Sequence, residues 1–202
     1  MNNLDQLRQN HPWPATRPEV PTDMENGWFH GENRNVIETI LPRARVVLEL
    51  GAWLGMSARW MADRFSGTVI TIDHWEGSRE HGNMSELNSL WDTFCTNCWG
   101  HRDRIIPVKL KTIAGMREVH SLGIKPELIY VDASHEANDV AGDLNLILEL
   151  FPSAHIVGDD WCWTSVRQGV FQVVEPPTFT RHMVTRTACY EIFPADARAY
   201  HP

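Results

Sequence analysis

The chain has 202 residues, 43% of them hydrophobic, and its 26 Asp and Glu outnumber 18 Lys and Arg to give a net charge of −8. This length and apolar content predict a single domain with one sizeable core. The acidic balance, without any long run of Lys or Arg, excludes a basic surface that could follow a phosphate backbone, so we expect no nucleic-acid partner.

The N-terminal region predicts neither a signal peptide nor a membrane anchor. Its first 21 residues lack an apolar core, and no later stretch approaches the roughly 18 apolar residues of a membrane span. The four cysteines are too few, and too irregularly spaced, for a disulfide framework. We therefore expect a cytoplasmic protein with reduced thiols and no membrane partner.

The predicted elements begin after a proline-rich segment. Residues 1–25 have four prolines and little apolar content, which predicts an extended arm or lid ahead of one domain over 26–202. A short helix is expected before Pro42, a buried strand over 44–50, and a helix over 56–65.

The rest of the chain alternates between apolar strand patterns and helical patterns. Strands are expected over 67–73, 104–110, 127–132 and 154–160, and helices over 113–122, 135–151 and 165–174. Two short runs, 181–185 and 188–193, predict a terminal antiparallel hairpin. This order predicts an α/β fold of Rossmann-like type, with a doubly wound, mostly parallel, seven-stranded sheet that ends in the hairpin.

Cys95 and Cys98, followed by His101, allow two interpretations. The C-x-x-C spacing is that of half a zinc site, but no second pair follows at a suitable distance. The segment 87–100 also has the apolar periodicity of a helix, and this favours packing of both thiols in the core.

A glycine-containing turn follows the first strand. Its spacing is G-x-x-x-G, from Gly51 to Gly55, and Trp53 stands where a dinucleotide-binding loop needs a second glycine. A nicotinamide cofactor is therefore not expected. Asp73 ends the second strand about 20 residues further on, where a carboxylate can accept both hydroxyls of a ribose. Alone, Gly51 could be an ordinary turn and Asp73 a helix cap.

In this order, these residues resemble the class I S-adenosylmethionine (SAM) dependent methyltransferases, over about residues 26–193. The resemblance implies that Glu49, Gly51 and Gly55 hold the methionine part of SAM and that Asp73 binds its ribose. By the same resemblance, the cofactor site includes Trp53, His74 and Thr112, with Thr112 near the adenine.

Carboxylates also follow the fourth and fifth strands. Asp132, Asp159 and Asp160 should meet at the carboxyl edge of the sheet, with no Lys or Arg nearby in the sequence, and they would repel one another unless a cation lay between them. An oxygen-rich set of this kind suits Mg²⁺. Alternatively, Asp160 caps the next helix and Asp132 faces water.

The three carboxylates resemble the magnesium ligands of the metal-dependent O-methyltransferases of the catechol and macrocin types. The resemblance implies a hydroxyl-bearing small molecule as methyl acceptor. His135 stands where the catechol type has its basic lysine, which makes it the candidate general base beside Asp132. Four tryptophans after strand ends could wall the acceptor pocket for a sugar or an aromatic ring, or could be core residues: Trp53, Trp75, Trp161 and Trp163.

Two rival functions remain open. One is a metal-dependent enzyme of another class on the same fold, such as a hydroxylase, and the other is a non-catalytic module that binds SAM. The sequence does not name the acceptor, and it leaves the oligomeric state open, a homo-oligomer included.

Overall fold

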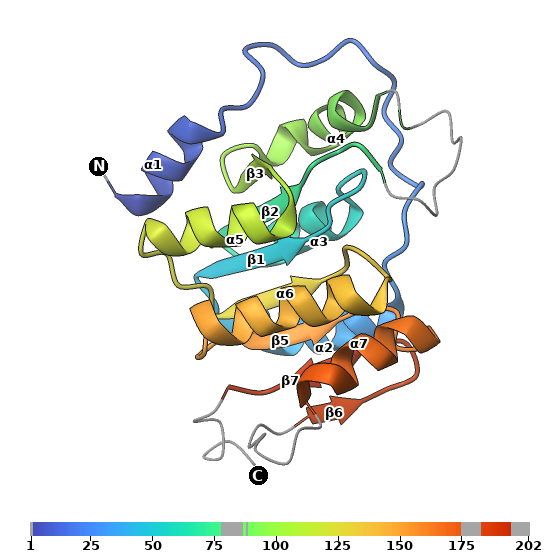
Figure 1. The fold of residues 1–202 in the computed structure, drawn as a ribbon. Coiled ribbons are helices and arrows are strands. Elements are labelled where there is room, and N and C mark those ends of the chain that lie inside the picture. Colours follow the sequence, from blue (N-terminus) through green and yellow to red (C-terminus); the bar gives the residue numbers. More distant parts are fainter. Residues whose placement is uncertain (1, 78–86, 88, 175–182, 195–202) are drawn as a thin grey trace.

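The computed structural model describes residues 2–77, 87, 89–174 and 183–194. Seven strands form one sheet in the order β3-β2-β1-β4-β5-β7-β6 (Figure 1). Five of them are parallel: β1 (Val46–Leu50), β2 (Thr68–Asp73), β3 (Ile105–Lys109), β4 (Leu128–Val131) and β5 (His155–Gly158). The hairpin of β6 (Met183–Thr185) and β7 (Tyr190–Ile192) closes the sheet with antiparallel pairing. The predicted class I methyltransferase fold is confirmed; the first two residues of the predicted hairpin, Arg181 and His182, lie outside the described residues.

Helices cover both faces of this sheet and bury two apolar clusters against it. On one face pack α2 (Gly31–Ile40), α3 (Met56–Arg64) and α4 (Leu90–Cys98). On the other pack α5 (Thr112–Ser121), α6 (Ala137–Leu150) and α7 (Thr164–Val174), which stand in front of the strands in Figure 1. The central strands are buried on both faces, as their continuous apolar runs predicted.

The edge position of β3 follows from its sequence. Pro107 lies in this strand and cannot donate a hydrogen bond to a second neighbour. Among the described strands, β3 lies at the edge of the sheet and pairs with β2 alone. An edge strand tolerates Pro107, because the backbone N–H that proline lacks is not needed for a second neighbouring strand.

The N-terminus differs from the extended segment that its prolines predicted. Residues Asn3–Asn10 form helix α1, whose first turn is capped by the Asn2 side chain, a 2.8 Å acceptor for the Asp5 amide. Leu7 is fully buried in the cluster beneath α5, and His11 pairs with Glu118 of α5 at 3.0 Å. Capping and this buried leucine outweigh the polar composition of the segment.

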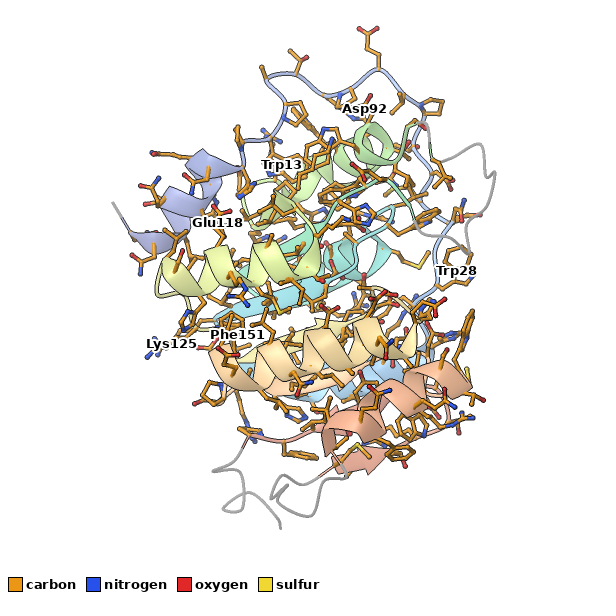
Figure 2. All side chains as sticks on the ribbon, in the orientation of Figure 1. Trp13, Trp28, Asp92, Glu118, Lys125 and Phe151 are labelled. Atoms are coloured by element: carbon orange, nitrogen blue, oxygen red, sulfur yellow. The ribbon has the colours of Figure 1, made fainter. Side chains whose placement is uncertain are left out.

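The arm that follows α1 is extended, as predicted, and is fastened along its length. The Trp13 indole donates to the carbonyl of Ile105 at 3.1 Å, and the Asn97 side chain donates to the carbonyl of Asp23 at 2.7 Å. In Figure 1 the arm arches past α4 and reaches α2 at the carboxyl edge of the parallel strands, where Figure 2 labels Trp28. The arm therefore brings its last residues to the edge where ligands bind in such sheets.

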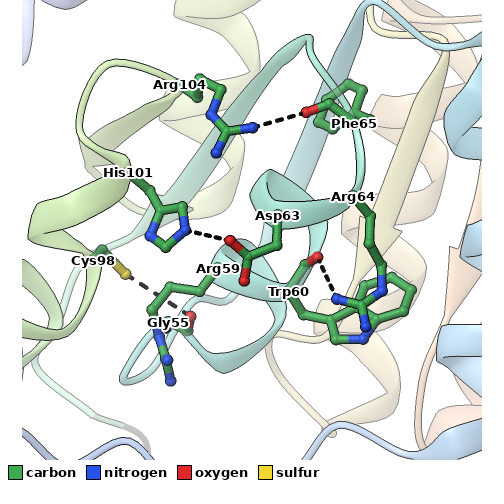
Figure 3. A network of polar contacts seen from close by, with 9 residues as sticks. All are labelled: Gly55, Arg59, Trp60, Asp63, Arg64, Phe65, Cys98, His101 and Arg104. Carbon is green, nitrogen blue, oxygen red and sulfur yellow. Dashed lines mark hydrogen bonds and ion pairs between the residues drawn. The ribbon is translucent and has the colours of Figure 1, made fainter.

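The contacts between α3 and α4 settle the two interpretations of the C-x-x-C segment. His101 pairs with Asp63 at 2.7 Å, and the Cys98 thiol lies 3.8 Å from the carbonyl of Gly55 (Figure 3). Cys95 and Cys98 are buried on α4, and neither belongs to a group of possible metal ligands within the described ranges. The interpretation as helix packing is confirmed.

Among the residues that the structure describes, no helix has the length and apolar character needed to cross a bilayer.

Candidate active site

The loop after β1 and the loop after β4 touch at the carboxyl edge of the sheet. Gly51 has φ +85°, and a Cβ at this position would lie 1.9 Å from the carbonyl oxygen of Asp132. Only glycine allows both this backbone conformation and this approach. The glycine of the predicted cofactor loop therefore also brings that loop against the first of the predicted metal ligands.

Asp73, at the end of β2, organises the loop after β1. Its Oδ2 accepts hydrogen bonds from the amides of Ala52 and Trp53 at 2.9 and 3.0 Å, and its Oδ1 accepts one from Trp75 at 2.7 Å. Trp53 and Trp75 both have positive φ angles, 47° and 52°, which these bonds help to hold. A carboxylate has about four lone-pair sites, so Asp73 keeps capacity for a further donor. Its predicted role toward a ribose stays a prediction.

The other predicted cofactor residues lie in different surroundings. Glu49 is fully buried, and this burial raises the pKa of its carboxyl to about 7, although hydrogen bonds from Ser57 and Thr71 offset part of the rise.

The predicted cofactor residues His74 and Thr112 both make hydrogen bonds within the protein. The His74 ring accepts a hydrogen bond from the amide of Glu76 within its own turn. The Thr112 hydroxyl donates to Asp143 of α6 at 2.6 Å. The hydroxyl of Thr112 thus links α5 to α6, and the predicted place of Thr112 near the adenine stays a prediction.

The carboxylates after β4 and β5 meet around the hydroxyl of Tyr130. This hydroxyl lies 2.7 Å from Asp159 Oδ2 and 3.2 Å from Asp132 Oδ2, and it accepts a hydrogen bond from the Asn33 side chain at 3.3 Å. A phenol has one proton, so it can donate to one of the two carboxylates at a time. Asp160 has φ 53°, and its own amide donates to Asp159 Oδ1 at 2.7 Å.

The electrostatics of this cluster are unfavourable without a cation. Burial raises the pKa of Asp132 well above its usual range, and the charges of Asp159 and Asp160 raise it further. In the described part of the chain, no Lys or Arg pairs with these three carboxylates. His135 offsets part of the repulsion among these carboxylates, and its Nε2 lies 2.7 Å from Asp160 Oδ2.

The donor atoms form two groups that share Asp160. Asp132, His135 and Asp160 have ligand atoms within 4.8 Å of one another, and so do His30, Asp159 and Asp160. A cavity of about 10 Å³ lies among Asp132, His135, Asp159 and Asp160, which is room for one water-sized particle. These donors and this cavity fit a divalent ion. The structure thus brings the three predicted carboxylates together. It also adds His30 and His135 to the possible metal ligands, and these ligands form two overlapping groups.

The four tryptophans predicted to wall a pocket have two different environments. Trp75 packs in the core against Trp91 and Phe94, and Trp161 packs against Phe171 and Tyr190. Trp75 is 5% exposed and belongs to the core, so the wall interpretation is wrong for it, whereas Trp161 is only partly buried and its role as a wall stays a prediction. The other two lie at the edge of the sheet. Trp53 lies beside Trp28, with ring centroids 6.0 Å apart, and Trp163, which is 45% exposed, packs against His135 with centroids 4.7 Å apart and the rings tilted by 37°.

Four residues of the site were not predicted from the sequence. Tyr130 carries a weak signal, because it stands two positions before Asp132 on the same face of β4. Asn33, His30 and Trp28 carry none, because the arm and α2 reach the site only through the tertiary fold. Trp28 is 57% exposed, which places a second large aromatic ring beside Trp53 at the surface.

Comparison with known proteins identifies the family of the chain. Residues 48–161 match a family described as a methyltransferase domain, whereas a search of curated protein sequences finds no match. The O-methyltransferase TomG from Streptomyces achromogenes, involved in tomaymycin synthesis and solved with SAM, has 16% identity and a TM-score of 0.60, over 83% of this chain and 82% of TomG.

Two further solved structures have the same fold. An O-methyltransferase from Bacillus cereus, in complex with S-adenosylhomocysteine (SAH), has 15% identity and a TM-score of 0.54 over 95% of this chain and 97% of its own. The SAH-bound methyltransferase PaMTH1 from Podospora anserina has 15% identity and a TM-score of 0.60 over 96% and 86%. The matched segment runs from β1 through the acidic pair after β5, and the chain therefore belongs to the methyltransferase-domain family, as a methyltransferase of the class I fold.

Proposed function

We propose that this methyltransferase moves the methyl group of SAM to a hydroxyl of a small molecule, with a divalent ion held by Asp132, Asp159 and Asp160. One observation carries the proposal: three carboxylates surround a cavity the size of one ion, and no Lys or Arg pairs with them within the described residues. That cavity adjoins the glycine loop, because Gly51 touches the backbone of Asp132.

The loop after β1 is the proposed cofactor site. Its backbone is fixed by Asp73, and Glu49 lies buried beneath it. SAM or SAH is bound in TomG and in the Bacillus cereus and Podospora anserina enzymes, which have the same fold, and this supports SAM as the cofactor here.

A divalent ion, when bound, lowers the pKa of a substrate hydroxyl and thereby makes its oxygen a better nucleophile. The side chains supply position and proton transfer. The carboxylates of Asp132, Asp159 and Asp160 would bind the ion at the carboxyl edge of the sheet. The Tyr130 hydroxyl orients those of Asp132 and Asp159. The His135 imidazole, paired with Asp160, is the proposed general base for the acceptor hydroxyl.

Exposed aromatic rings favour a flat or ring-shaped acceptor. Trp163 packs against His135, and Trp28 with Trp53 forms a second aromatic surface at the same edge. Indole faces bind aromatic rings and the apolar faces of sugars. We therefore propose an acceptor that carries its hydroxyl on such a ring.

The test uses SAM with a labelled methyl group and a panel of catechols, phenols and sugars. We expect a labelled methyl ether and SAH, with the rate lost in EDTA and restored by added metal. His135→Ala should lower kcat by about 10² to 10⁴-fold with little change in SAH affinity, since a positioned base contributes in that range. If methyl transfer continued at the same rate in EDTA, the metal ion would have no part in the reaction.

The same experiment separates the rivals. A hydroxylase would consume an oxidant and an acceptor without producing SAH. A non-catalytic module would bind SAH but transfer no label to any member of the panel.

A further inference from the structure

We propose that His30 is a ligand of the metal ion, and that its nitrogen gives the site a preference for Mn²⁺, Co²⁺ or Zn²⁺ over Mg²⁺. The inference rests on the proposed function, because it concerns an ion at the same acidic cluster, held on the side where His30 shares its donor group with Asp159 and Asp160 and not with Asp132. It adds a residue from the N-terminal side of the chain to a set of donors otherwise drawn from the loops after β4 and β5.

The position of His30 is the first observation. One nitrogen of its ring lies within 4.8 Å of a carboxylate oxygen of Asp159 and of one of Asp160. Among the described residues, nothing forms a hydrogen bond or an ion pair with the imidazole, and it makes no capping bond at the start of α2. His30 is exposed, so its imidazole is free to turn toward an ion between these two carboxylates.

The second observation is that the residues on both sides of His30 are packed or hydrogen-bonded. Phe29, on one side, is 6% exposed and meets the ring of Tyr130 edge-on at 5.6 Å. On the other side, the Glu32 carboxylate accepts the amide of Ala188 at 2.7 Å. Asn33 donates to the hydroxyl of Tyr130.

These contacts tie His30 to the same tyrosine that holds Asp132 and Asp159. The backbone on both sides of His30 is therefore fixed relative to the carboxylates. When an ion binds, the side-chain torsions of His30 are ordered, whereas the backbone around it is already in place.

The chemistry of the donors then decides between ions. Mg²⁺ binds oxygen ligands almost exclusively, whereas imidazole nitrogen suits first-row transition metals and zinc. A set of carboxylates with one imidazole therefore shifts the preference away from Mg²⁺. His135, the other histidine of the cluster, is already paired with Asp160 at 2.7 Å and packed against Trp163, which suits it to the separate role of base.

The test measures metal binding to the whole chain, freed of metal by dialysis against EDTA, without any acceptor or turnover. Calorimetric titrations with Mn²⁺ and with Mg²⁺ compare the wild type with His30→Ala and His30→Asp. The matched control is His120→Ala, which removes an exposed histidine of α5. Pulsed EPR of the Mn²⁺-loaded proteins reports directly whether a nitrogen is bound to the ion.

We expect the wild type to bind Mn²⁺ at least about tenfold more tightly than Mg²⁺, because a nitrogen donor favours the transition metal. His30→Ala should weaken Mn²⁺ binding by about 10 to 100-fold, a loss at least as large as that from removing a group that only orients a ligand. Its Mg²⁺ affinity should change less than about threefold, because Mg²⁺ uses the carboxylates. His30→Asp should restore binding with the preference moved toward Mg²⁺, and His120→Ala should match the wild type.

The EPR signal should show nitrogen coupling that disappears in His30→Ala. Equal Mn²⁺ affinity and unchanged nitrogen coupling in wild type and His30→Ala would overturn the inference while leaving a metal-assisted methyltransferase intact. A wild type that binds neither ion would overturn this inference and also the metal in the proposed function, but SAH binding would still support the methyltransferase.

Discussion

Replacing Glu49 by Gln should reduce the loss of stability that the wild type suffers between pH 5 and pH 8. The Glu49 carboxyl is completely buried on β1, and this burial raises its pKa from 4.5 to about 7. Between these two pH values the folded chain keeps the proton and the unfolded chain releases it. Because the folded state then binds more protons, the free energy of unfolding falls as the pH rises.

The size of the effect follows from the same two values. At about 1.36 kcal/mol per pH unit, the gap between 4.5 and about 7 amounts to about 3 kcal/mol, essentially all of it lost by pH 8. Gln keeps the shape of the protonated acid and cannot ionise. Glu49→Gln should therefore be less sensitive to pH and, at pH 8, more stable than the wild type.

Urea unfolding followed by circular dichroism at pH 5, 6, 7 and 8 measures this difference. Glu149→Gln, at an exposed position on α6, is the matched control and should follow the wild type. All other titrating groups are common to the variants, so the difference between curves isolates Glu49. Parallel curves for wild type and Glu49→Gln would refute the reasoning, since they would mean that Glu49 is ionised in the folded protein at neutral pH.

Two further substitutions test the packing of the site. Tyr130→Phe removes the hydroxyl shared by two buried carboxylates and an amide, and should lower the free energy of unfolding of the metal-free protein by about 1 to 3 kcal/mol in urea titrations. Gly51→Ala places a Cβ 1.9 Å from a carbonyl oxygen at φ +85° and should cost at least about 2 kcal/mol by the same measurement. The control Gly142→Ala, on a helix with open space around its Cβ, should be neutral or stabilising by up to about 1 kcal/mol.

Each of these has an outcome that contradicts it. A Tyr130→Phe protein as stable as the wild type would mean that the hydroxyl does not serve the carboxylates. If Gly51→Ala unfolds at the same urea concentration as Gly142→Ala, the close approach of the β1 and β4 loops is not a constraint on the fold.

The order of the elements could be predicted because their signals are local. The apolar runs of β1, β2, β4 and β5, the helical periods between them and the glycines after β1 each lie within a short window. Since parallel strands end at one edge, the convergence of Asp132, Asp159 and Asp160 followed from the topology alone. The helix α1 was missed because one buried leucine and one capping asparagine decide it within a polar segment.

The remainder of the site depends on contacts between distant parts of the chain. His30 and Trp28 come to the carboxyl edge because the arm is fastened to α4 and because α2 packs on Tyr130, and neither contact has a local pattern. The environments of the tryptophans also could not be predicted from local sequence patterns. Trp75 follows a strand end just as Trp53 and Trp163 do, yet it is buried against the rings of Trp91 and Phe94.

The most direct test of the central claim is a calorimetric titration of SAH into the wild type and into Asp73→Asn. SAM-dependent methyl transfer predicts saturable binding of one SAH per chain, with no binding of NADH. Asp73→Asn keeps an acceptor for the loop amides but loses the charge that would hold the ribose, so its affinity for SAH should fall by about 10 to 150-fold, the equivalent of 1.5 to 3 kcal/mol. Absence of heat with the wild type, or equal affinity in the two proteins, would contradict a cofactor site at the ends of β1 and β2.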